Sequence, residues 1–305
     1  MSLRLHTEVS DGGRPNHGLR SGRGDRGVRL AALCAALCLC GLCAQRAVAG
    51  RDSGIAQPPM QAQPGSASGQ QPTGEAPVHP VHPLIVSELS AVDVVPDGDL
   101  SKALWSDAKR IRFDQAAFQA ATYPESATTV ASRWTAKYLY LGFWCNYQSL
   151  NIYEGEDPGP ERMQLWDKDV VEAFINPEPD RTQHYYEFEV APNNQWVDLE
   201  IDLTRRPFGN AQWNSGFQHA TRVDAVHHVW TSEWRIPMSS IAPAAPHANE
   251  EWRLNFYRCD GPGSNATRRE MSWGAMPPDS PEHTFHQPAS FGVLRFVNDS
   301  AGSGH

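Results

Sequence analysis

The chain has 305 residues, of which 20% are charged and 40% hydrophobic, and its formal net charge at pH 7 is −9. This length allows two domains, and it excludes neither an enzyme nor a binding module. Because acidic residues outnumber basic ones and no Lys/Arg cluster stands out, nucleic acid is excluded as the main partner.

Residues 1–49 are predicted to be a secretory signal with an extended N-terminus. The first 28 residues are rich in Gly, Arg and Ser, an apolar run covers 30–43, and Ala47-Val48-Ala49 is a small-x-small cleavage site. The run is shorter than the roughly 20 residues of a membrane-spanning helix. We therefore expect export, to the periplasm, the cell surface or the medium, and no membrane contact beyond the signal. A retained anchor is the alternative.

Residues 50–83 are rich in Pro, Gln, Gly and Ser and nearly free of large apolar side chains. Such a segment cannot bury enough surface to offset its ordering entropy, so a disordered linker is predicted. Residues 84–298 are long enough for one domain with a sizeable core, and 299–305 form a tail.

Short strand-like runs and frequent turn signals fill the predicted domain, which has no long segment with helical periodicity. This pattern favours an all-β fold, specifically an antiparallel β-sandwich of the jelly-roll-like kind. Outside the central stretch at 165–202, the expected strands begin near Val86 and then cover 128–135, 137–147, 220–226, 229–236, 252–258, 271–273 and 293–297.

The central stretch, 165–202, contains three strand-like runs. In the second run, Glu187 and Glu189 alternate with apolar residues, which predicts one buried and one solvated face. The first run is apolar on both faces, and Glu172 lies on the face of Val170 and Phe174. A carboxylate among such neighbours is costly unless it is paired or used.

This stretch resembles the family 9 carbohydrate-binding modules, which are β-sandwiches of the wider DOMON-like group. The resemblance rests on a Trp-Asp-x-Asp-x-Val-Glu-x-Phe signature at 166–174 and a Tyr-Tyr-x-Phe-x-Val strand at 185–190, and further motifs extend it over 86–297. It implies an exported, non-catalytic module that binds an oligo- or polysaccharide.

The resemblance also implies site residues. An aromatic residue at Trp166 would stack on a sugar ring, and the carboxylate at Glu172 would hydrogen-bond sugar hydroxyls. Phe285 matches the position of the second stacking aromatic, and Trp273 is another candidate for that wall. For each aromatic residue, a place in the sandwich core is the competing interpretation.

The chain departs from the family where an arginine is expected in the strand after the signature, because Glu187 and Glu189 are found there. Arg258 is the candidate replacement donor. Its face of the strand also contains Trp252 and Phe256, so a buried ion pair, with Glu172 as one candidate partner, is the alternative.

No cofactor is certain from the sequence. The resemblance implies calcium, held by carboxylates and carbonyls near the sandwich ends, although no EF-hand-like spacing occurs. His283 and His286 are spaced like metal ligands, yet the pair also suits a solvated loop. Which groups would hold a metal stays unknown.

Two other functions remain open. Glycosidases need two carboxylates, which Asp167, Asp169 and Glu172 could supply, but a strand points Glu172 away from the other two. The haem-binding branch of the DOMON-like group uses an axial Met and His, and no spacing in this chain selects such a pair.

Cys145 and Cys259 remain after signal removal, in a compartment that favours disulfides. Each closes a strand, so the two could meet at one sheet end. Strict alternation, however, puts their sulfur atoms on unlike faces. A disulfide and two buried free thiols are both left open.

Overall fold

The computed structural model of the chain describes residues 82–262, 268–277 and 283–298. Within them, no helix is long and apolar enough to span a bilayer. The predicted signal and all but the end of the predicted linker lie outside the described residues, as does the tail, so these predictions stay untested.

The strands are β1 (Leu84–Leu89), β2 (Arg110–Phe113), β3 (Thr128–Trp134), β4 (Tyr138–Asn146), β5 (Val170–Asn176), β6 (His184–Val190), β7 (Trp196–Asp202), β8 (Gly209–Asn210), β9 (Gln218–Asp224), β10 (Val229–Pro237), β11 (Glu251–Asp260), β12 (Arg269–Ser272) and β13 (Gly292–Val297). The helical segments are α1 (Ala103–Ser106), α2 (Met238–Ile241) and the 3₁₀ turns η1 (Pro124–Ser126), η2 (Leu165–Asp167) and η3 (Pro288–Ser290).

All described strands belong to one sheet in the order β8-β7-β6-β5-β11-β13-β1-β3-β4-β10-β9, while β12 pairs with β11 and β2 with β3. The all-β prediction is confirmed. The sheet is mixed rather than purely antiparallel, because β1 lies parallel to both β13 and β3. Parallel neighbours need a crossover instead of a hairpin, and the segment from β1 to β3, which contains α1 and β2, provides one.

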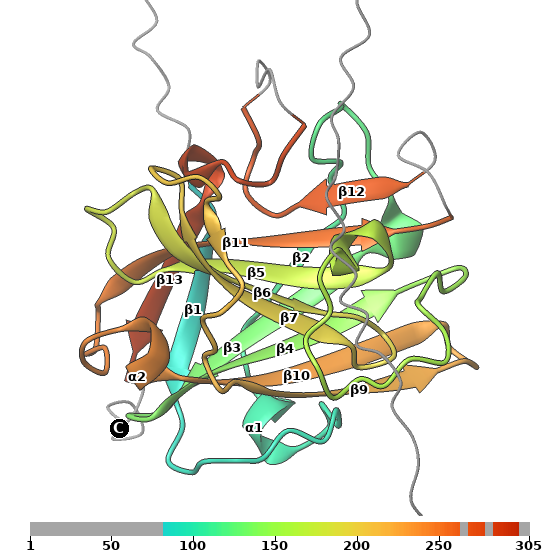
Figure 1. Ribbon diagram of the computed structural model, residues 1–305. Helices are drawn as coiled ribbons and strands as arrows, with labels where there is room; N and C mark the ends of the chain where they lie inside the picture. The colour runs from blue at the N-terminus through green and yellow to red at the C-terminus, as the bar shows by residue number, and fades with distance from the viewer. Residues whose placement is uncertain (1–81, 263–267, 278–282, 299–305) are drawn as a thin grey trace, which may run out of the picture. The chain divides into compact units, whose positions relative to one another are not determined.

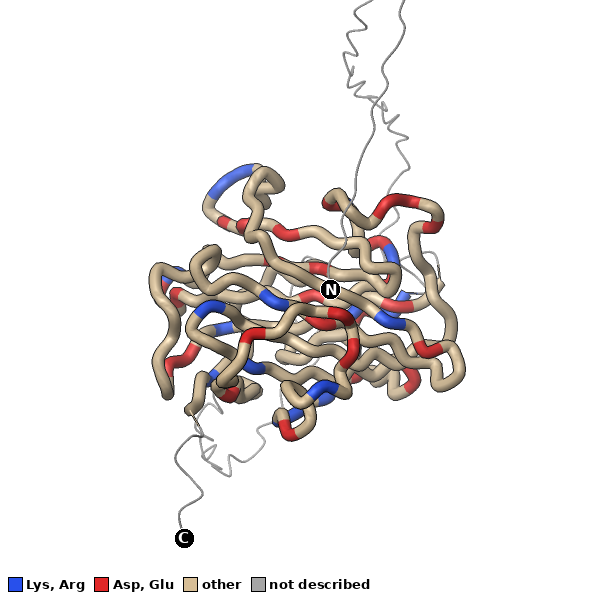
Figure 2. Tube along the Cα trace, turned by 90° about the horizontal axis from the view of Figure 1, so that it is seen from below, with Lys and Arg blue, Asp and Glu red and all other residues tan. Residues whose placement is uncertain are grey.

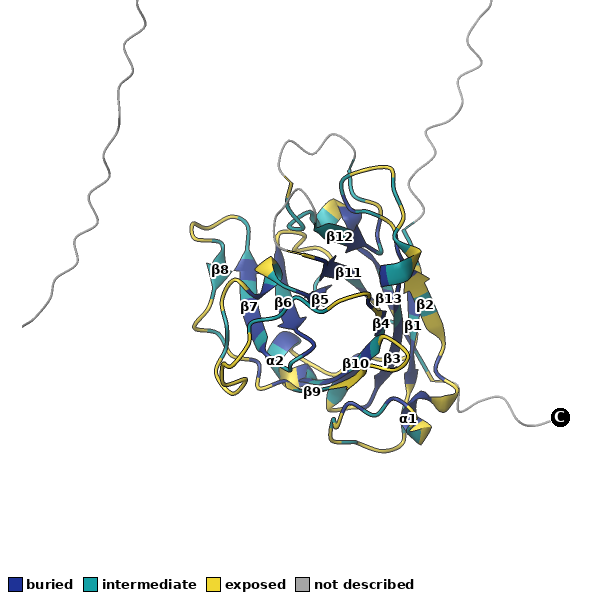
Figure 3. Ribbon diagram, turned by 90° about the vertical axis from the view of Figure 1, so that its right-hand side faces the viewer, coloured by how far each residue is buried: buried dark blue, intermediate teal, exposed yellow. Residues whose placement is uncertain are grey.

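The sheet curls so that its two halves face each other. Figure 3 shows β5, β6 and β7 on one side and β3, β4 and β10 on the other, and Figure 1 shows the same two groups as stacked layers. The main apolar cluster takes residues from both halves, for example Phe188 from β6, Phe143 from β4 and Trp234 from β10. This interior core gives the domain the character of a sandwich.

Strand β5 is buried on both faces, as the sequence predicts. Val171 and Ile175 join the interior core, whereas Val170 and Phe174 face outward into a second cluster. That second cluster lies on the outer face of β5, β6, β7 and β11, and it also includes Phe291. A strand in this position has both faces covered, which explains its continuous apolar run.

The outer face of β6 differs from its prediction. Glu187 and Glu189 point to the side opposite Phe188, as the alternation requires, but they are 3% and 0% exposed instead of solvated. The cause is long-range, because residues 283–286 and the η2 turn line the pocket over this face together with both glutamates.

The two cysteines are free and buried. Cys145 belongs to the interior core and Cys259 to the outer cluster, so the sheet itself separates their sulfur atoms. The disulfide alternative is therefore wrong, and the objection from strand alternation gives the reason.

Candidate functional site

A cavity of about 650 Å³ lies over the outer face of β5, β6, β7 and β11. Its floor comes from residues of these strands, among them Glu172, Glu189 and Cys259. Its walls come from five segments far apart in sequence: Phe118, the η2 turn with the residues just before it, residues 206–209, the region around β12, and residues 283–286. The cavity is therefore built by the same loops that bury the outer face of the sheet.

Three glutamates form the floor of the cavity. Glu172 of β5 lies directly opposite Glu189 of β6 in the antiparallel register, and Glu187 stands two residues before Glu189 on the same face. One carboxylate oxygen from each lies within 4.8 Å of the others. Like charges placed opposite each other on a sheet repel, and all three side chains are buried, so this arrangement costs stability in the absence of a compensating group.

Few partners satisfy these carboxylates. The Cys259 thiol donates to Glu172 Oε1 at 3.6 Å. The His286 Nε2 atom is 3.9 Å from Glu187 Oε2, too far for a hydrogen bond. Within the described residues, neither carboxylate oxygen of Glu189 receives a hydrogen bond from a donor group.

Burial and mutual repulsion change the acidity of the cluster. Burial raises the pKa of Glu172 well above its usual range, and the nearby Glu187 carboxylate adds to the effect. Burial likewise raises the pKa of Glu189, with further contributions from Glu172 and Glu187. Both shifts have the direction expected of carboxyl groups that lack water and lie close to like charges.

The cavity is acidic although the domain surface is mixed. Five carboxylate residues line it, against the two arginines Arg206 and Arg268. Arg268 donates hydrogen bonds to the backbone carbonyls of Trp166 and Lys168, so it supports the η2 turn. Acidic and basic residues are both spread over the described domain in Figure 2, which makes the excess of carboxylates in the cavity a local feature.

Aromatic side chains form the walls. Trp166 lies in η2 at the cavity mouth and is partly exposed, as expected of a ligand-facing ring. Phe285 also lines the cavity, but it stacks on Tyr257 at 4.2 Å and on Phe118 at 5.7 Å between ring centroids, which leaves its edge to the cavity. Phe118 continues this stack and lines the same cavity. Sequence reasoning missed Phe118, because its segment has no strand or helix period.

His286 holds the floor in place. Its Nδ1 atom is 2.7 Å from the Tyr185 hydroxyl oxygen, and its ring stacks on Phe174 with centroids 5.2 Å apart. Burial raises the pKa of Tyr185 above its usual range, so this phenol stays protonated, and the tautomer of His286 sets which of the two groups donates the bond. The structure thus places His286 beside the carboxylate cluster through an aromatic scaffold.

Arg258 lies away from this cavity. Its side chain is fully buried on the interior face of β11, 5.0 Å from the Trp230 ring centroid. It donates to Asp260 Oδ1 at 3.1 Å, and Asp260 also pairs with Arg269. The predicted alternative of a buried ion pair is therefore what the structure shows, with Asp260 in place of Glu172 as the partner.

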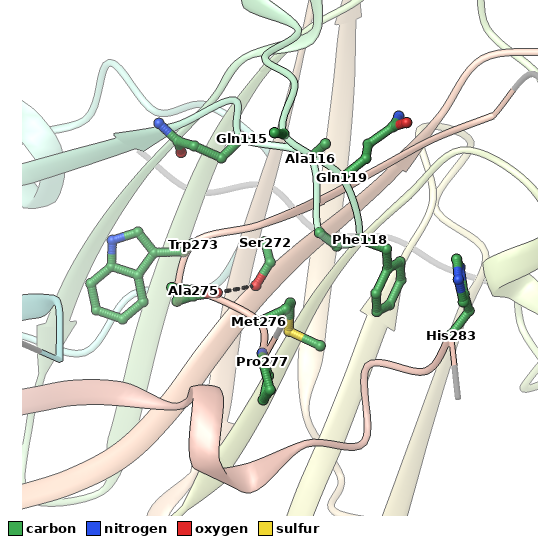
Figure 4. Close-up of a pocket in the computed structure, with 13 residues that line it drawn as sticks. Gln115, Ala116, Phe118, Gln119, Ser272, Trp273, Ala275, Met276, Pro277 and His283 are labelled. Atoms are coloured by element: carbon green, nitrogen blue, oxygen red, sulfur yellow. Dashed lines mark hydrogen bonds between the residues drawn. The ribbon is translucent and has the colours of Figure 1, made fainter. Parts of the chain in front are cut away.

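Trp273 borders a neighbouring, smaller cavity of about 390 Å³. Figure 4 shows Trp273 on one side of it and Phe118 and His283 on the other. Phe118 and His283 also line the larger cavity, so the two cavities adjoin. The Trp273 ring packs on Phe256, 5.5 Å away between centroids, and hence against the interior core.

Calcium ligands were expected near the sandwich ends. Among the described residues, the one group of three acidic or metal-binding side chains close enough to share an ion is the glutamate cluster, which lies on the sheet face. Asp169 is near a strand end, but its carboxylate is occupied by the backbone N–H groups of Asn151 and Gly261. Burial raises the Asp169 pKa to about 6 despite these bonds. Within the described residues, the sandwich ends thus offer no group of three acidic, His or Cys side chains for the implied calcium.

Comparisons with known proteins agree on one family. Residues 95–299 match the family described as carbohydrate family 9 binding domain-like. A carbohydrate-binding module of family 9 from Caldicellulosiruptor kristjanssonii, solved with cellotriose and with glucose, has the same fold with a TM-score of 0.50 in each case. Identity is 17% and 15%, and 73% of this chain and 99–100% of the module are covered. A relative from Arthroderma benhamiae named "Extracellular protein" is 27% identical over 202 residues, which are 61% of this chain and 85% of that protein.

Proposed function

Because the chain belongs to the carbohydrate family 9 binding domain-like family, we propose that its outer-face cavity binds an oligo- or polysaccharide without cleaving it. One observation supports this most directly. The cavity combines the partly exposed indole of Trp166 with carboxylate acceptors on its floor, and Trp166 and one of these acceptors, Glu172, both belong to the signature at 166–174. The neighbouring module's complexes with cellotriose and glucose point to the same ligand class.

The physical basis is complementarity between a sugar ring and two parts of the cavity, its aromatic wall and its carboxylate floor. Axial C–H groups give a pyranose an apolar face that packs on an aromatic ring, which is the role we propose for Trp166. Sugar hydroxyls then donate to carboxylate oxygens, and Glu172, which lines the same cavity as Trp166, is the acceptor we propose. The second wall would come from the edge of Phe285 and from Phe118.

Replacing Trp166 with Ala is expected to weaken saccharide binding by about 1–3 kcal/mol, by analogy with the loss of ring stacking on nucleic-acid bases. Isothermal titration calorimetry with cellotriose would measure the difference after a glycan screen has confirmed a bound ligand. Trp213→Ala is the matched control, since this half-buried tryptophan stacks on Tyr186 outside the cavity and should leave affinity unchanged. An unchanged affinity in Trp166→Ala would remove this residue from the site.

A glycoside hydrolase is the second candidate, favoured by the closeness of Glu172 and Glu189. Retaining glycosidases place their two carboxyl groups about 5–5.5 Å apart on either side of the scissile bond. Here all three glutamates belong to one face of the sheet and so do not flank a ligand. Release of reducing ends from a β-1,4-glucan, abolished by Glu172→Gln, would favour the hydrolase.

Export is part of the proposal. The relative from Arthroderma benhamiae is named as extracellular, and the apolar run at 30–43 with Ala47-Val48-Ala49 supports a cleaved signal. The protein expressed with its own N-terminus is expected in the medium or periplasm, beginning at Gly50. N-terminal sequencing of that fraction checks this. Recovery of the uncut chain in the membrane fraction would instead indicate the retained anchor.

A further inference from the structure

Glu187 and Glu189 stand in the strand where the family resemblance implies an arginine, and with Glu172 they give the cavity a buried cluster of three glutamates. Glu172 and Glu189 face each other across two strands, and Glu187 completes the cluster with oxygens within 4.8 Å. An acidic cluster alone does not define a site. Here a second observation accompanies it: Glu189 is fully buried, lines the cavity, and has two carboxylate oxygens without a hydrogen-bond donor among the described residues.

We infer that this cluster binds the ammonium group of an amino sugar, so that the cavity prefers saccharides of 2-amino-2-deoxy hexoses over neutral ones. This inference rests on the proposed saccharide binding and names its substrate class. The geometry fits the cation. An ammonium group that donates three charge-assisted hydrogen bonds of about 2.8 Å along tetrahedral directions places its acceptors about 4.6 Å apart. One oxygen from each of the three glutamates lies within 4.8 Å of the others, which is the same range.

The surroundings favour an organic cation over a bare metal ion. Calcium takes six to eight oxygen ligands at about 2.3–2.6 Å and needs little space beyond them. The cavity instead has about 650 Å³ and is bordered by Trp166, Phe208 and Phe285. An aromatic face next to carboxylates is a combination that recognises ammonium groups, and Trp166 is the ring proposed to supply that face, since Phe285 presents its edge. A sugar with an ammonium group would contact both the aromatic walls and the glutamates of the floor, whereas a metal ion would contact the glutamates alone.

The arginines that line the cavity form no ion pair with the cluster, although the Arg268 charge acts against burial by lowering the pKa of Glu172 and Glu189. The Arg268 guanidinium donates to the carbonyl oxygens of Trp166 and Lys168, and Arg206 donates to the carbonyl oxygens of Leu203 and Arg205. Neither arginine forms an ion pair with Glu172, Glu187 or Glu189 among the described residues, where the closest cationic candidate is the His286 ring at 3.9 Å from Glu187. The cluster therefore keeps carboxylate oxygens without a donor, and a ligand ammonium group can donate hydrogen bonds to them.

The test compares three trisaccharides on the full chain by calorimetry. The β-1,4-linked glucosamine trimer and cellotriose differ only in the 2-amino group, and the N-acetylated trimer has the same linkage without the charge. We expect the glucosamine trimer to bind at least about 10-fold more tightly than either neutral trimer, because a hydrogen bond to a charged group is the stronger kind. In Glu189→Gln the preference should fall to within a few-fold, and Glu251→Gln, on the exposed edge of β11, is the control that keeps it.

The possible outcomes separate the inference from the proposed function. Equal affinity for cellotriose and the glucosamine trimer would overturn the inference and leave saccharide binding in place. Binding of none of the three, with no ligand in the glycan screen, would overturn both. Calcium alone raising the melting temperature of the wild-type protein, but not of Glu189→Gln, with no preference for the amine, would replace the amino sugar with a metal ion. A preference for the amine that Glu189→Gln retains would also reject this cluster as its cause.

Discussion

Replacing Arg258 with Met is expected to lower the free energy of unfolding by about 3–5 kcal/mol, because it removes one member of a buried ion pair and leaves the charge of the other buried. Arg258 and Asp260 are both fully buried and 3.1 Å apart. The guanidinium also donates to the Cys259 carbonyl and contributes to the field at Asp169. Its loss leaves Arg269 as the remaining cation beside two buried carboxylates. Urea unfolding of the full chain measures the change.

The same variant tests the role that the family resemblance suggests for Arg258. Since its side chain lies on the interior face of β11, saccharide affinity should be unchanged at temperatures where the variant stays folded. Arg295→Met is the matched control. Arg295 pairs with Glu251 on the surface, with both side chains nearly half exposed, so its loss should cost at most about 1 kcal/mol. A tenfold weaker affinity with intact stability would make Arg258 a ligand residue after all.

Local periodicity predicted which way each of these side chains points. Alternation placed Arg258 with the apolar face of its strand, and it separated Cys145 from Cys259. The true partner of Arg258 was also visible, since Asp260 stands two residues later on the same face. Glu172, the candidate partner from the sequence, lines the outer cavity and so lies on the other side of the sheet from Arg258.

Which loops cover the outer face of the sheet could not be predicted from local periodicity. Alternation shows that Glu187 and Glu189 share a face, but not that residues 283–286 lie over that face roughly 100 positions later in the chain. Phe118 belongs to a segment without any period, so only the folded chain brings it beside Phe285. The parallel placement of β1 between β13 and β3 likewise depends on how the two ends of the domain meet. The resemblance to a family located Trp166 and Glu172 because its motif spans both.

The glutamate cluster makes stability depend on pH in a direction that is unusual for carboxylates. A free glutamate has a pKa of about 4.3, and burial raises the pKa of Glu189 well above that in the folded protein. Between these two values the folded state keeps a proton that the unfolded state has released. The free energy of unfolding therefore falls as pH rises through this window, by up to about 1.4 kcal/mol per pH unit for each such proton.

Glu189→Gln is accordingly expected to stabilise the protein more as the pH increases. Glutamine keeps the size of the side chain and cannot ionise, and its presence also removes a like charge beside Glu172. Near pH 4, where both forms are neutral at this position, the two proteins should differ little. By pH 7 the variant should be the more stable one. Urea unfolding at pH 4, 5.5 and 7 gives the difference, in which the titrating groups distant from the cluster cancel.

Glu200→Gln provides a control of opposite sign on the neighbouring strand β7. Hydrogen bonds from His184 and Asn210 lower the pKa of Glu200, so its contribution is present above the usual glutamate pKa and is lost as the pH falls. The free energy of unfolding of that variant should be lower than the wild-type value at pH 7 and should approach the wild-type value as the pH falls. If the stability difference for Glu189→Gln stays constant from pH 4 to 7, Glu189 does not carry a displaced proton. The repulsion within the cluster would then have to be relieved by another group, such as a cation bound in the cavity even without added saccharide.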